Sequence, residues 1–452
     1  MEYRPTIARR GLAAALLSAS LLAGGSGAAM SQSTLPLKGT ISSAEAADEA
    51  TPPKPVQAQL SETTLEIAPP EPVEPGPIAP ANRTAADPYA PHGFGHEGLR
   101  LYASLNTSGV YSDNVNQTSN DPESDVGLGL RPTLRLESNW IRHSLTANLS
   151  GDFVSYRDNQ SANTQTLDSD AVLRLDIRRN LIANLEAGYT IDTPSNEDPV
   201  EHTLSASAGL TRDFGRLRAS LEGGAVLRHY EDSETSGGAS QSNDDLNYVQ
   251  PSVLLRTSYG VSDLLRPYIE LAFTPRHHTD TPDRNGIDRD SQGYGVSAGV
   301  EIAAGPLWTG ELGLTYLHRN YNDGSLAPVD AVGLTGVVTW SPTELTSIVF
   351  AASTAIDETS STAEGGQPTW IASVNATHDL RDNVELSAGA SVEIDDLGTS
   401  YEKTYDANLG VAWKFNPNLS WTAGYDLTWL DQGSAGNGYV EQRLSTGLTV
   451  TR

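Results

Sequence analysis

Apolar and polar side chains alternate with a period of two residues over most of the chain after Gly98. In one such stretch, Leu173 and Leu175 alternate with Arg174 and Asp176. Because successive side chains of a β-strand point to opposite faces, this pattern predicts strands with one apolar and one charged face. The chain after Gly98 is therefore expected to be all-β.

Eighteen segments of this kind follow one another along the chain. They begin near residues 98, 125, 142, 168, 181, 200, 216, 246, 263, 291, 307, 328, 344, 367, 384, 401, 418 and 437. The segment from Leu345 to Ile356 has the weakest pattern, because both of its faces are mixed in polarity. We predict a sheet of about eighteen strands, with sixteen as the lower bound.

Short turns and long polar loops alternate strictly between these segments. Arg179-Asn180 and Gly305-Pro306 are short connections, whereas residues 231–245 and 277–290 form long ones. Outer-membrane β-barrels have short periplasmic turns at one end and long extracellular loops at the other. The pattern therefore predicts a transmembrane antiparallel up-and-down β-barrel in the outer membrane of a Gram-negative bacterium.

Aromatic residues concentrate near the ends of the predicted strands. Trp308 and Trp340 lie near short turns, and Tyr111 and Trp429 lie near long loops. Two rings of aromatic side chains at the two membrane interfaces are typical of such barrels. No run of 18 apolar residues occurs in the sequence, so the crossing of the membrane would rest on strands.

The first 97 residues differ in composition from the rest. Arg4, Arg9 and Arg10 precede a short apolar run and small residues, which is typical of a secretory signal peptide over residues 1–29. Residues 30–97 are rich in proline and acidic residues, which predicts a disordered segment in the periplasm. The barrel is expected over residues 98–452.

Composition and motifs exclude several kinds of function. The formal net charge of −28 argues against nucleic acid as a partner, because phosphate contacts need Lys and Arg. The chain has no cysteine, which excludes disulfides and thiolate metal sites. We expect no enzyme activity, no catalytic residue and no cofactor, because neither Gly-x-Ser-x-Gly nor His-Glu-x-x-His occurs.

One loop has a spacing of oxygen ligands that is partly typical of calcium sites. It runs from His277 to Asp290 and carries acidic residues around Gly286. It lacks a glutamate at the distance that a bidentate ligand would need. A solvated acidic loop without metal is therefore the preferred interpretation.

The polar faces of the strands would line the lumen. Arginines prevail on the first nine strands and acidic residues from the tenth strand on. The candidate pore-lining residues are Arg100, Arg131, Arg135, Arg174, Arg218, Arg256, Glu301, Glu311, Glu385, Glu393, Asp406 and Asp426. We hypothesise a basic wall opposite an acidic wall, which would give a transverse electric field. The alternative is local cross-strand ion pairing.

A short motif occurs twice where a strand leads into a long loop. Arg228-His229-Tyr230-Glu231-Asp232 matches Arg319-Asn320-Tyr321-Asn322-Asp323 in its spacing of Arg, Tyr and Asp. The preferred interpretation is a rim motif, with Tyr at the membrane interface and Asp at the start of the turn. A ligand-binding rim is the alternative.

Several strand-end motifs resemble those of a known family. They are Tyr111-Ser112-Asp113-Asn114-Val115, Leu130-Arg131-Pro132-Thr133-Leu134, Arg142-His143-Ser144-Leu145, Tyr156-Arg157-Asp158-Asn159 and Trp340-Ser341-Pro342-Thr343. Over residues 98–452 the chain resembles the putative beta-barrel porin two family. The resemblance implies an outer-membrane β-barrel, and that family includes proteins encoded beside exopolysaccharide-synthesis genes.

A barrel of about eighteen strands leaves an aqueous lumen unless something fills it. We therefore expect a porin-like passive channel for small hydrophilic solutes. Two alternatives stay open: an outer-membrane component of exopolysaccharide export, which only the resemblance implies, and a structural barrel with an occluded lumen. Expected partners are outer-membrane lipid, lipopolysaccharide, the barrel-assembly machinery and the solutes or polysaccharide. The sequence identifies neither the solute nor the oligomeric state.

Overall fold

The computed structural model describes residues 88–193, 199–234, 240–305, 307–358, 365–398, 400–433 and 436–452. The predicted signal peptide (1–29) and the proline-rich segment up to residue 87 lie outside the described residues. The short strand β1 (Phe94–His96) falls within the range 30–97 that we assigned to the disordered segment, and it pairs with the first barrel strand. No helix in the described ranges is long and apolar enough to cross a membrane.

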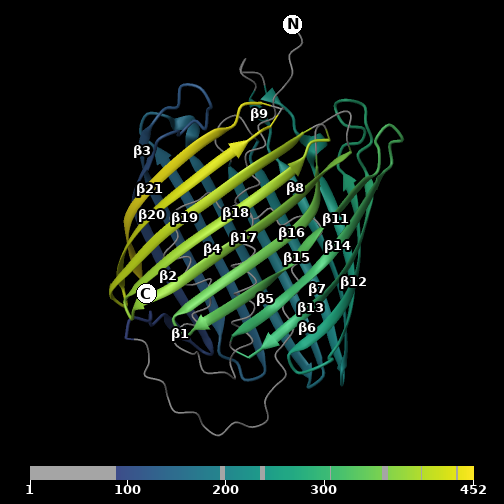
Figure 1. The fold of residues 1–452 in the computed structure, drawn as a ribbon, viewed down its shortest axis with the longest axis horizontal. Helices are drawn as coiled ribbons and strands as arrows, with labels where there is room; N and C mark the ends of the chain where they lie inside the picture. Colours follow the sequence, from purple (N-terminus) through teal and green to yellow (C-terminus); the bar gives the residue numbers. More distant parts are fainter. Residues whose placement is uncertain are drawn as a thin grey trace.

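Eighteen long strands of the described chain form one closed antiparallel sheet (Figure 1). They are β2 (Leu99–Ser112), β3 (Asp125–Ser138), β4 (His143–Tyr156), β5 (Thr164–Arg178), β6 (Leu181–Thr193), β7 (Glu201–Phe214), β8 (Leu217–Tyr230), β11 (Tyr248–Tyr259), β12 (Leu265–His278), β13 (Ser291–Ala304), β14 (Trp308–Tyr321), β15 (Val329–Thr343), β16 (Thr346–Glu358), β17 (Gly366–Arg381), β18 (Val384–Asp396), β19 (Tyr401–Asn416), β20 (Leu419–Asp431) and β21 (Tyr439–Thr451). Two very short strands, β9 (Ser233–Glu234) and β10 (Ser240–Gln241), pair within the loop after β8.

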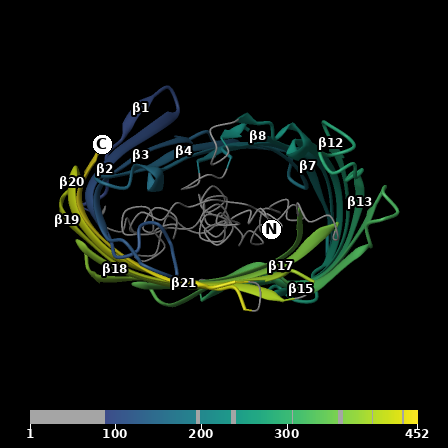
Figure 2. The same ribbon diagram turned by 90° about the horizontal axis from the view of Figure 1, so that it is seen from above.

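The ring closes where the first and last long strands meet. Each long strand pairs with the next one along the chain, and β2 pairs with β21 from Ser104↔Thr451 to Ser112↔Arg443. Seen from above, the ring is a flattened oval (Figure 2). Closure removes the two free sheet edges that an open sheet would leave. The predicted eighteen-stranded barrel is confirmed.

The predicted strand starts agree with the structure to within two residues, with one exception. β5 begins at Thr164, four residues before the predicted position 168. The early part of β5 is polar, and it is a strand because Thr164 and Thr166 pair with Val154 and Asp152 of β4. Pairing with a neighbour therefore extends a strand that has little alternation of its own.

The barrel is apolar outside and polar inside. In β11, Gln250 and Arg256 are buried, whereas Val253 and Leu255 on the other face are about half exposed. The same inversion holds along β12 and β13, where polar side chains are buried and leucine, valine or tyrosine side chains are exposed. Since only a lipid surrounding makes such an exterior favourable, the described strands are those of a membrane-embedded barrel.

A charge on this outer face is expected to destabilise the barrel. Leu255→Arg near the middle of β11 should cost about 2–4 kcal/mol of unfolding free energy, because the guanidinium would lie in the hydrocarbon region. Val261→Arg, in the turn after β11, should cost about 0–1 kcal/mol and serves as the control. Urea unfolding of the barrel refolded into lipid vesicles measures both values. Equal costs for the two variants would contradict the membrane position assigned to this face.

The aromatic side chains near the strand ends stack across neighbouring strands. Trp308 and Trp340 stack with ring centroids 5.3 Å apart near the short turns. Tyr405 and Trp429 stack at 5.0 Å toward the long-loop end. Both pairs lie at the ends where the sequence predicted the two aromatic rings. Aromatic side chains at such positions are typical of the two membrane interfaces.

Candidate functional site

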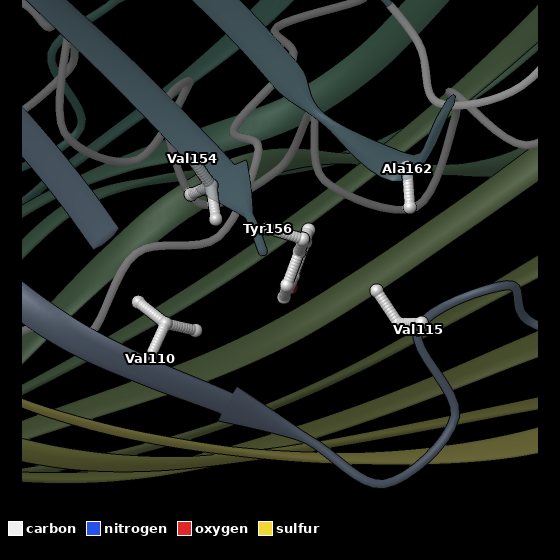
Figure 3. Close-up of a cluster of buried hydrophobic side chains, with 5 residues drawn as sticks. All are labelled: Val110, Val115, Val154, Tyr156 and Ala162. Atoms are coloured by element: carbon white, nitrogen blue, oxygen red, sulfur yellow. The ribbon is translucent and has the colours of Figure 1, made fainter. Parts of the chain in front are cut away.

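One set of loops leans into the lumen above β2 and β4. The lumen-facing Val110 and Val154 pack with Val115 from the loop after β2 and with Ala162 from the loop after β4 (Figure 3). Tyr156 lies between these side chains. The apolar cluster therefore holds both loops against the inner side of the wall, at the end of the barrel that carries the long loops.

The motif at the end of β2 closes the seam of the barrel. Ser112 donates a hydrogen bond to the Glu441 side chain at 2.8 Å, and both carboxylate oxygens of Asp113 accept hydrogen bonds from Gln442. Asn114 donates to the backbone carbonyl of Val440 at 2.9 Å. These residues belong to one of the motifs that resemble the family, so their role here is to join β2 to β21.

On the other side of the ring, the loop end of the β16–β17 hairpin does not stay in the barrel wall. β14 and β15 remain paired up to Arg319↔Val329, and β16 and β17 remain paired up to Glu358↔Gly366. The pairing between β15 and β16, in contrast, spans only the short-turn half of these strands and ends at Gly336↔Ala352. Above that point β16 and the start of β17 separate from β15. We call this part, residues 353–358 with 365–369, the inner hairpin end.

The inner hairpin end packs on the lumen face of β14 and β15. Ile356 is buried against Leu317 and Ala331, which both face the lumen. Thr354 donates a hydrogen bond to the Leu334 carbonyl at 2.9 Å, and the Trp370 indole donates to the Val332 carbonyl at 2.9 Å. Residues 354–357 are all buried, so both faces of this part of β16 are covered by other side chains.

A glycine permits this close approach. A side chain at Gly333 would collide with Thr354 and would come within 2.7 Å of Trp370. At the top of β14, Tyr321 touches Gly365 and Gly366 in the same way. Tyr321 therefore lies on the lumen side and not at the membrane interface that we predicted from the repeated motif. The predicted turn position of Asp323 is confirmed, since its carboxylate accepts hydrogen bonds from the Ser325 backbone and hydroxyl.

Arginines gather beneath the inner hairpin end. Arg276 on β12 and Arg319 on β14 both donate to the Gln250 side-chain oxygen, at 3.0 and 3.2 Å. Arg319 also donates to the Ser291 hydroxyl at 2.8 Å. Arg228 on β8 completes the group, which we call the arginine cluster. Arg228 and Arg276 lie over the Tyr248 ring, at 5.8 and 4.8 Å from its centroid.

The carboxylate that the inner hairpin end brings to the arginine cluster is Asp357. It is buried and attracted by Arg228, Arg276 and Arg319. It also interacts with Thr369, whose hydroxyl lies 2.6 Å from an oxygen of Asp395 on β18. Asp357 therefore connects the arginine cluster with the acidic side chains of the following strands.

A second buried charge cluster lies nearer the short turns. Arg256 donates to Glu270 at 2.8 Å and to both oxygens of Glu311, at 2.6 and 2.9 Å. Glu301 lies 3.9 Å from Arg256 and 3.5 Å from Arg266. The structure thus brings together three of the predicted pore-lining residues, namely Arg256, Glu301 and Glu311. Glu270 joins them, although it was not among the candidates.

The other predicted arginines are paired with nearby acids. The pairs are Arg131 with Asp152 at 3.1 Å, Arg135 with Glu137 at 2.5 Å, Arg174 with Asp176 at 2.9 Å and Arg218 with Asp213 at 2.7 Å. Arg100 is exposed near the start of β2. Arg131 and Arg218 thus make the cross-strand ion pairs of our alternative interpretation, whereas Arg135 and Arg174 pair with acids on their own strands.

The predicted acidic residues Glu385, Glu393, Asp406 and Asp426 are all buried on the inner faces of β18, β19 and β20. Asp395, Glu402 and Glu441 lie on the same part of the wall. In a ring of eighteen strands, β19, β20 and β21 are nine strands from β8, β11 and β12. The acidic side chains of β19, β20 and β21 therefore lie across the ring from β8, β11 and β12, and a transverse field between them stays a prediction.

Arginines hold the acidic loop between β12 and β13. Asp283 accepts hydrogen bonds from the backbone of Asn285 and Ile287, at 2.8 and 2.9 Å, and from Arg289 at 2.8 Å. Asp245, from the loop before β11, pairs with Arg284. Within the described residues, no group of three or more His, Asp or Glu side chains has the arrangement of a metal site.

Asp283 should make this loop sensitive to strong acid. Burial raises the pKa of Asp283, but its hydrogen bonds from Ile287, Arg289 and Asn285 outweigh burial and lower the pKa. A lowered pKa in the folded state means that the ionised form stabilises the loop above the ordinary value of about 3.9. This stabilisation is lost as the pH falls through the lowered value. The protection of the Ile287 amide, which is its exchange rate relative to the intrinsic rate at the same pH, should therefore stay high from neutral pH to about 4 and fall below it.

At neutral pH, Asp283→Asn should speed exchange at the Ile287 amide, and the exposed Asp280→Asn should not. Loss of a charged hydrogen-bond acceptor costs about 1–3 kcal/mol. Equal exchange in both variants would mean that the carboxylate of Asp283 does not hold the loop.

Sequence reasoning missed the residues that narrow the lumen. Arg228 and Arg276 lie on the polar faces of strands among the first nine, where the sequence predicts many arginines, and the repeated motif places Arg228 and Arg319 at the same rim. Nothing in the sequence placed Asp357 on the same side of the lumen as these arginines, because that placement requires β16 to leave the wall. The one available signal was the mixed polarity of the segment from Leu345 to Ile356, which has two buried faces at its upper end.

Several solved outer-membrane proteins have a similar structure. The outer membrane channel DcaP of Acinetobacter baumannii matches with a TM-score of 0.41 and 10% identity, covering 80% of this chain and 99% of that chain. A BenF-like porin from Pseudomonas fluorescens Pf-5 matches with a TM-score of 0.41 and 11% identity, covering 78% and 99%. A bacterial polysaccharide outer membrane secretin matches with a TM-score of 0.30 and 12% identity, covering 77% and 97%.

None of the curated proteins matches the sequence. The model of one protein family, described as Putative beta-barrel porin 2, matches residues 87–452, which is most of the chain. That range contains all eighteen barrel strands and begins just before the first described residue. The chain therefore belongs to the Putative beta-barrel porin 2 family of outer-membrane β-barrels.

Proposed function

We propose that the protein is a passive outer-membrane channel for small hydrophilic solutes and has no enzyme activity. The observation that carries this proposal is the closed eighteen-stranded ring, whose inner face is charged along its whole height. A lumen lined in this way favours water and polar solutes over apolar ones. The inner hairpin end and the loops of the apolar cluster narrow it at the long-loop end.

Arginines cover two of the inward-facing tyrosines in the part of the lumen that the structure describes. Tyr248 is covered by the guanidinium groups of Arg228 and Arg276, and Arg256 lies 4.0 Å from the centroid of the Tyr268 ring. A ring face that is covered by an arginine cannot stack on a sugar at the same time. We therefore favour small solutes over polysaccharide export. The N-terminal segment up to residue 97 is proposed to lie in the periplasm after removal of a signal peptide over 1–29.

Single-channel conductance of the refolded mature protein in planar lipid bilayers tests the proposal. Stable openings that scale with salt concentration are expected, both with and without residues 30–97. Silence from both forms, with folding shown by resistance to denaturation in detergent at room temperature, would contradict an open channel. It would favour a structural barrel.

A further inference from the structure

The short-turn end of the barrel carries a row of exposed arginines on one side of the ring. They lie in or beside the successive short turns after β3, β5 and β7, and they are Arg142, Arg178, Arg179, Arg212 and Arg216. The Arg142 guanidinium donates a hydrogen bond to the Asp176 carbonyl at 2.8 Å, which joins the first turn to the second. The Asp213 amide donates to the Asn180 carbonyl at 3.1 Å, which joins the second turn to the third. We call these five arginines the basic arc.

The charges of the basic arc are not neutralised by the acids that the structure describes. All five residues are exposed, and none of them forms an ion pair with a described carboxylate. Acids at the same turns pair with other arginines, since Asp176 binds Arg174 and Asp213 binds Arg218. The short turns after β11 and β15 carry the acidic residues Asp263 and Glu344 instead. The exposed positive charge is therefore concentrated on one side of the ring.

The basic arc lies where the lipid-facing surface ends. Near the end of β7, Leu210, Arg212 and Phe214 share the outer face, because they are two residues apart. Leu210 and Phe214 are 46% and 54% exposed, and the Arg212 guanidinium lies 4.8 Å from the centroid of the Phe214 ring. Ile141 and Ile177, next to other arginines of the arc, are also exposed. Arginines at such a boundary keep the charged group at the level of the lipid headgroups while their stems contact hydrocarbon.

The phosphate of a lipid headgroup is the anion that this position offers. The short turns of outer-membrane barrels lie on the periplasmic side, so the basic arc meets the periplasmic leaflet. The planar guanidinium group donates several hydrogen bonds that suit phosphate oxygens. Each arginine close to a membrane surface raises the affinity for anionic lipid by about fivefold. Several arginines in one row therefore favour anionic lipids over lipids without net charge.

We propose that the basic arc binds anionic phospholipids of the periplasmic leaflet, and that the lipid phosphates lie against Arg212 and its neighbours in the arc. Phosphatidylglycerol represents this class of lipid. The barrel would then carry a layer of anionic lipid on the side of β3 to β8. The inference goes beyond the proposed channel function and does not depend on whether the lumen conducts.

Lipid binding to the full-length mature protein in a neutral detergent tests the proposal. Phosphatidylglycerol or phosphatidylcholine is added in mixed micelles, and native mass spectrometry measures the bound lipid. Phosphatidylglycerol is expected to bind at least tenfold more tightly, because phosphatidylcholine has no net charge. Arg212→Gln combined with Arg216→Gln should weaken phosphatidylglycerol binding by about tenfold or more and leave phosphatidylcholine binding unchanged. Arg178→Gln combined with Arg179→Gln should act in the same direction.

Arg157→Gln combined with Arg381→Gln is the matched control. It also removes two exposed arginines, one at the long-loop end and one at the short turn after β17, outside the basic arc. This variant should keep the wild-type preference for phosphatidylglycerol. Equal affinity of the wild type for the two lipids would overturn the proposal, as would the wild-type preference in both double variants of the arc.

Two further measurements separate lipid from other anionic partners. Glycerol phosphate has the charged group without the acyl chains and should compete only weakly with phosphatidylglycerol. Competition at the affinity of the lipid itself would make the arc a site for soluble phosphates and would overturn the lipid assignment. A preference for phosphatidylglycerol that arises only after deletion of residues 30–87 would assign the arc to that acidic segment and would also overturn it.

Discussion

Arg256→Gln is expected to lower the unfolding free energy of the barrel by about 3–5 kcal/mol. Arg256 is buried between Glu270, Glu301 and Glu311, which are themselves nearly inaccessible to solvent. Removing its charge would leave three carboxylates close together with Arg266 near only one of them. The cost of an uncompensated buried charge then falls on the folded state alone.

Urea unfolding of the barrel refolded into lipid vesicles, followed by tryptophan fluorescence, measures this effect. Arg174→Gln is the matched control, because its partner Asp176 is about one-third exposed at 35%. That variant should lose about 1 kcal/mol or less. If both variants lost the same stability, the Arg256 cluster would be no more important than an ordinary ion pair. The unfolding free energy of the barrel would then not depend especially on this cluster.

Gly333→Val is expected to widen the channel mouth. The new side chain would collide with Thr354 and Trp370, so β16 could not approach β15 as closely. Overpacking of this kind costs about 1–3 kcal/mol, which the inner hairpin end can avoid by moving off the wall. Release of this end should raise the single-channel conductance and reduce the attraction of Asp357 to the arginine cluster.

Gly109→Val on β2 is the control for this prediction. A side chain there would meet no atom within 4 Å, and it would point away from the lumen. Its conductance should equal that of the wild type. An unchanged conductance in Gly333→Val, with the barrel folded, would mean that the inner hairpin end does not limit the flow of ions. The narrowest part of the lumen would then have to lie elsewhere.

The local pattern of the sequence contained most of the information on the fold. Where one face of a strand meets lipid and the other meets water, every second residue must be apolar. Such a strand can be predicted from its own residues, without knowledge of the strands that pair with it. This condition holds for β11, where Val253 and Leu255 face outward and Arg256 faces inward. It fails for the upper half of β16, whose residues from Thr354 to Asp357 are all buried.

The partners of the charged residues could be predicted only in part. Arg174 and Asp176 are two residues apart on β5 and share a face, so their pairing follows from the period of the strand. Arg256 and Glu311 are 55 residues apart and lie on strands that are not neighbours. Their contact depends on how far the side chains reach across the inner surface, which alternation does not describe.

The sequence by itself determined the number of strands, the starts of all but β5 to within two residues, the two kinds of connection and the polarity of the two faces. These are local properties, because each follows from the solvent that a residue meets and from the two-residue period of a strand. The tertiary structure alone decided that the end of β16 and β17 turns inward and that the carboxylate of Asp357 is buried there. The physical reason is that a closed ring brings together side chains from distant strands, and their packing selects which hairpin leaves the wall.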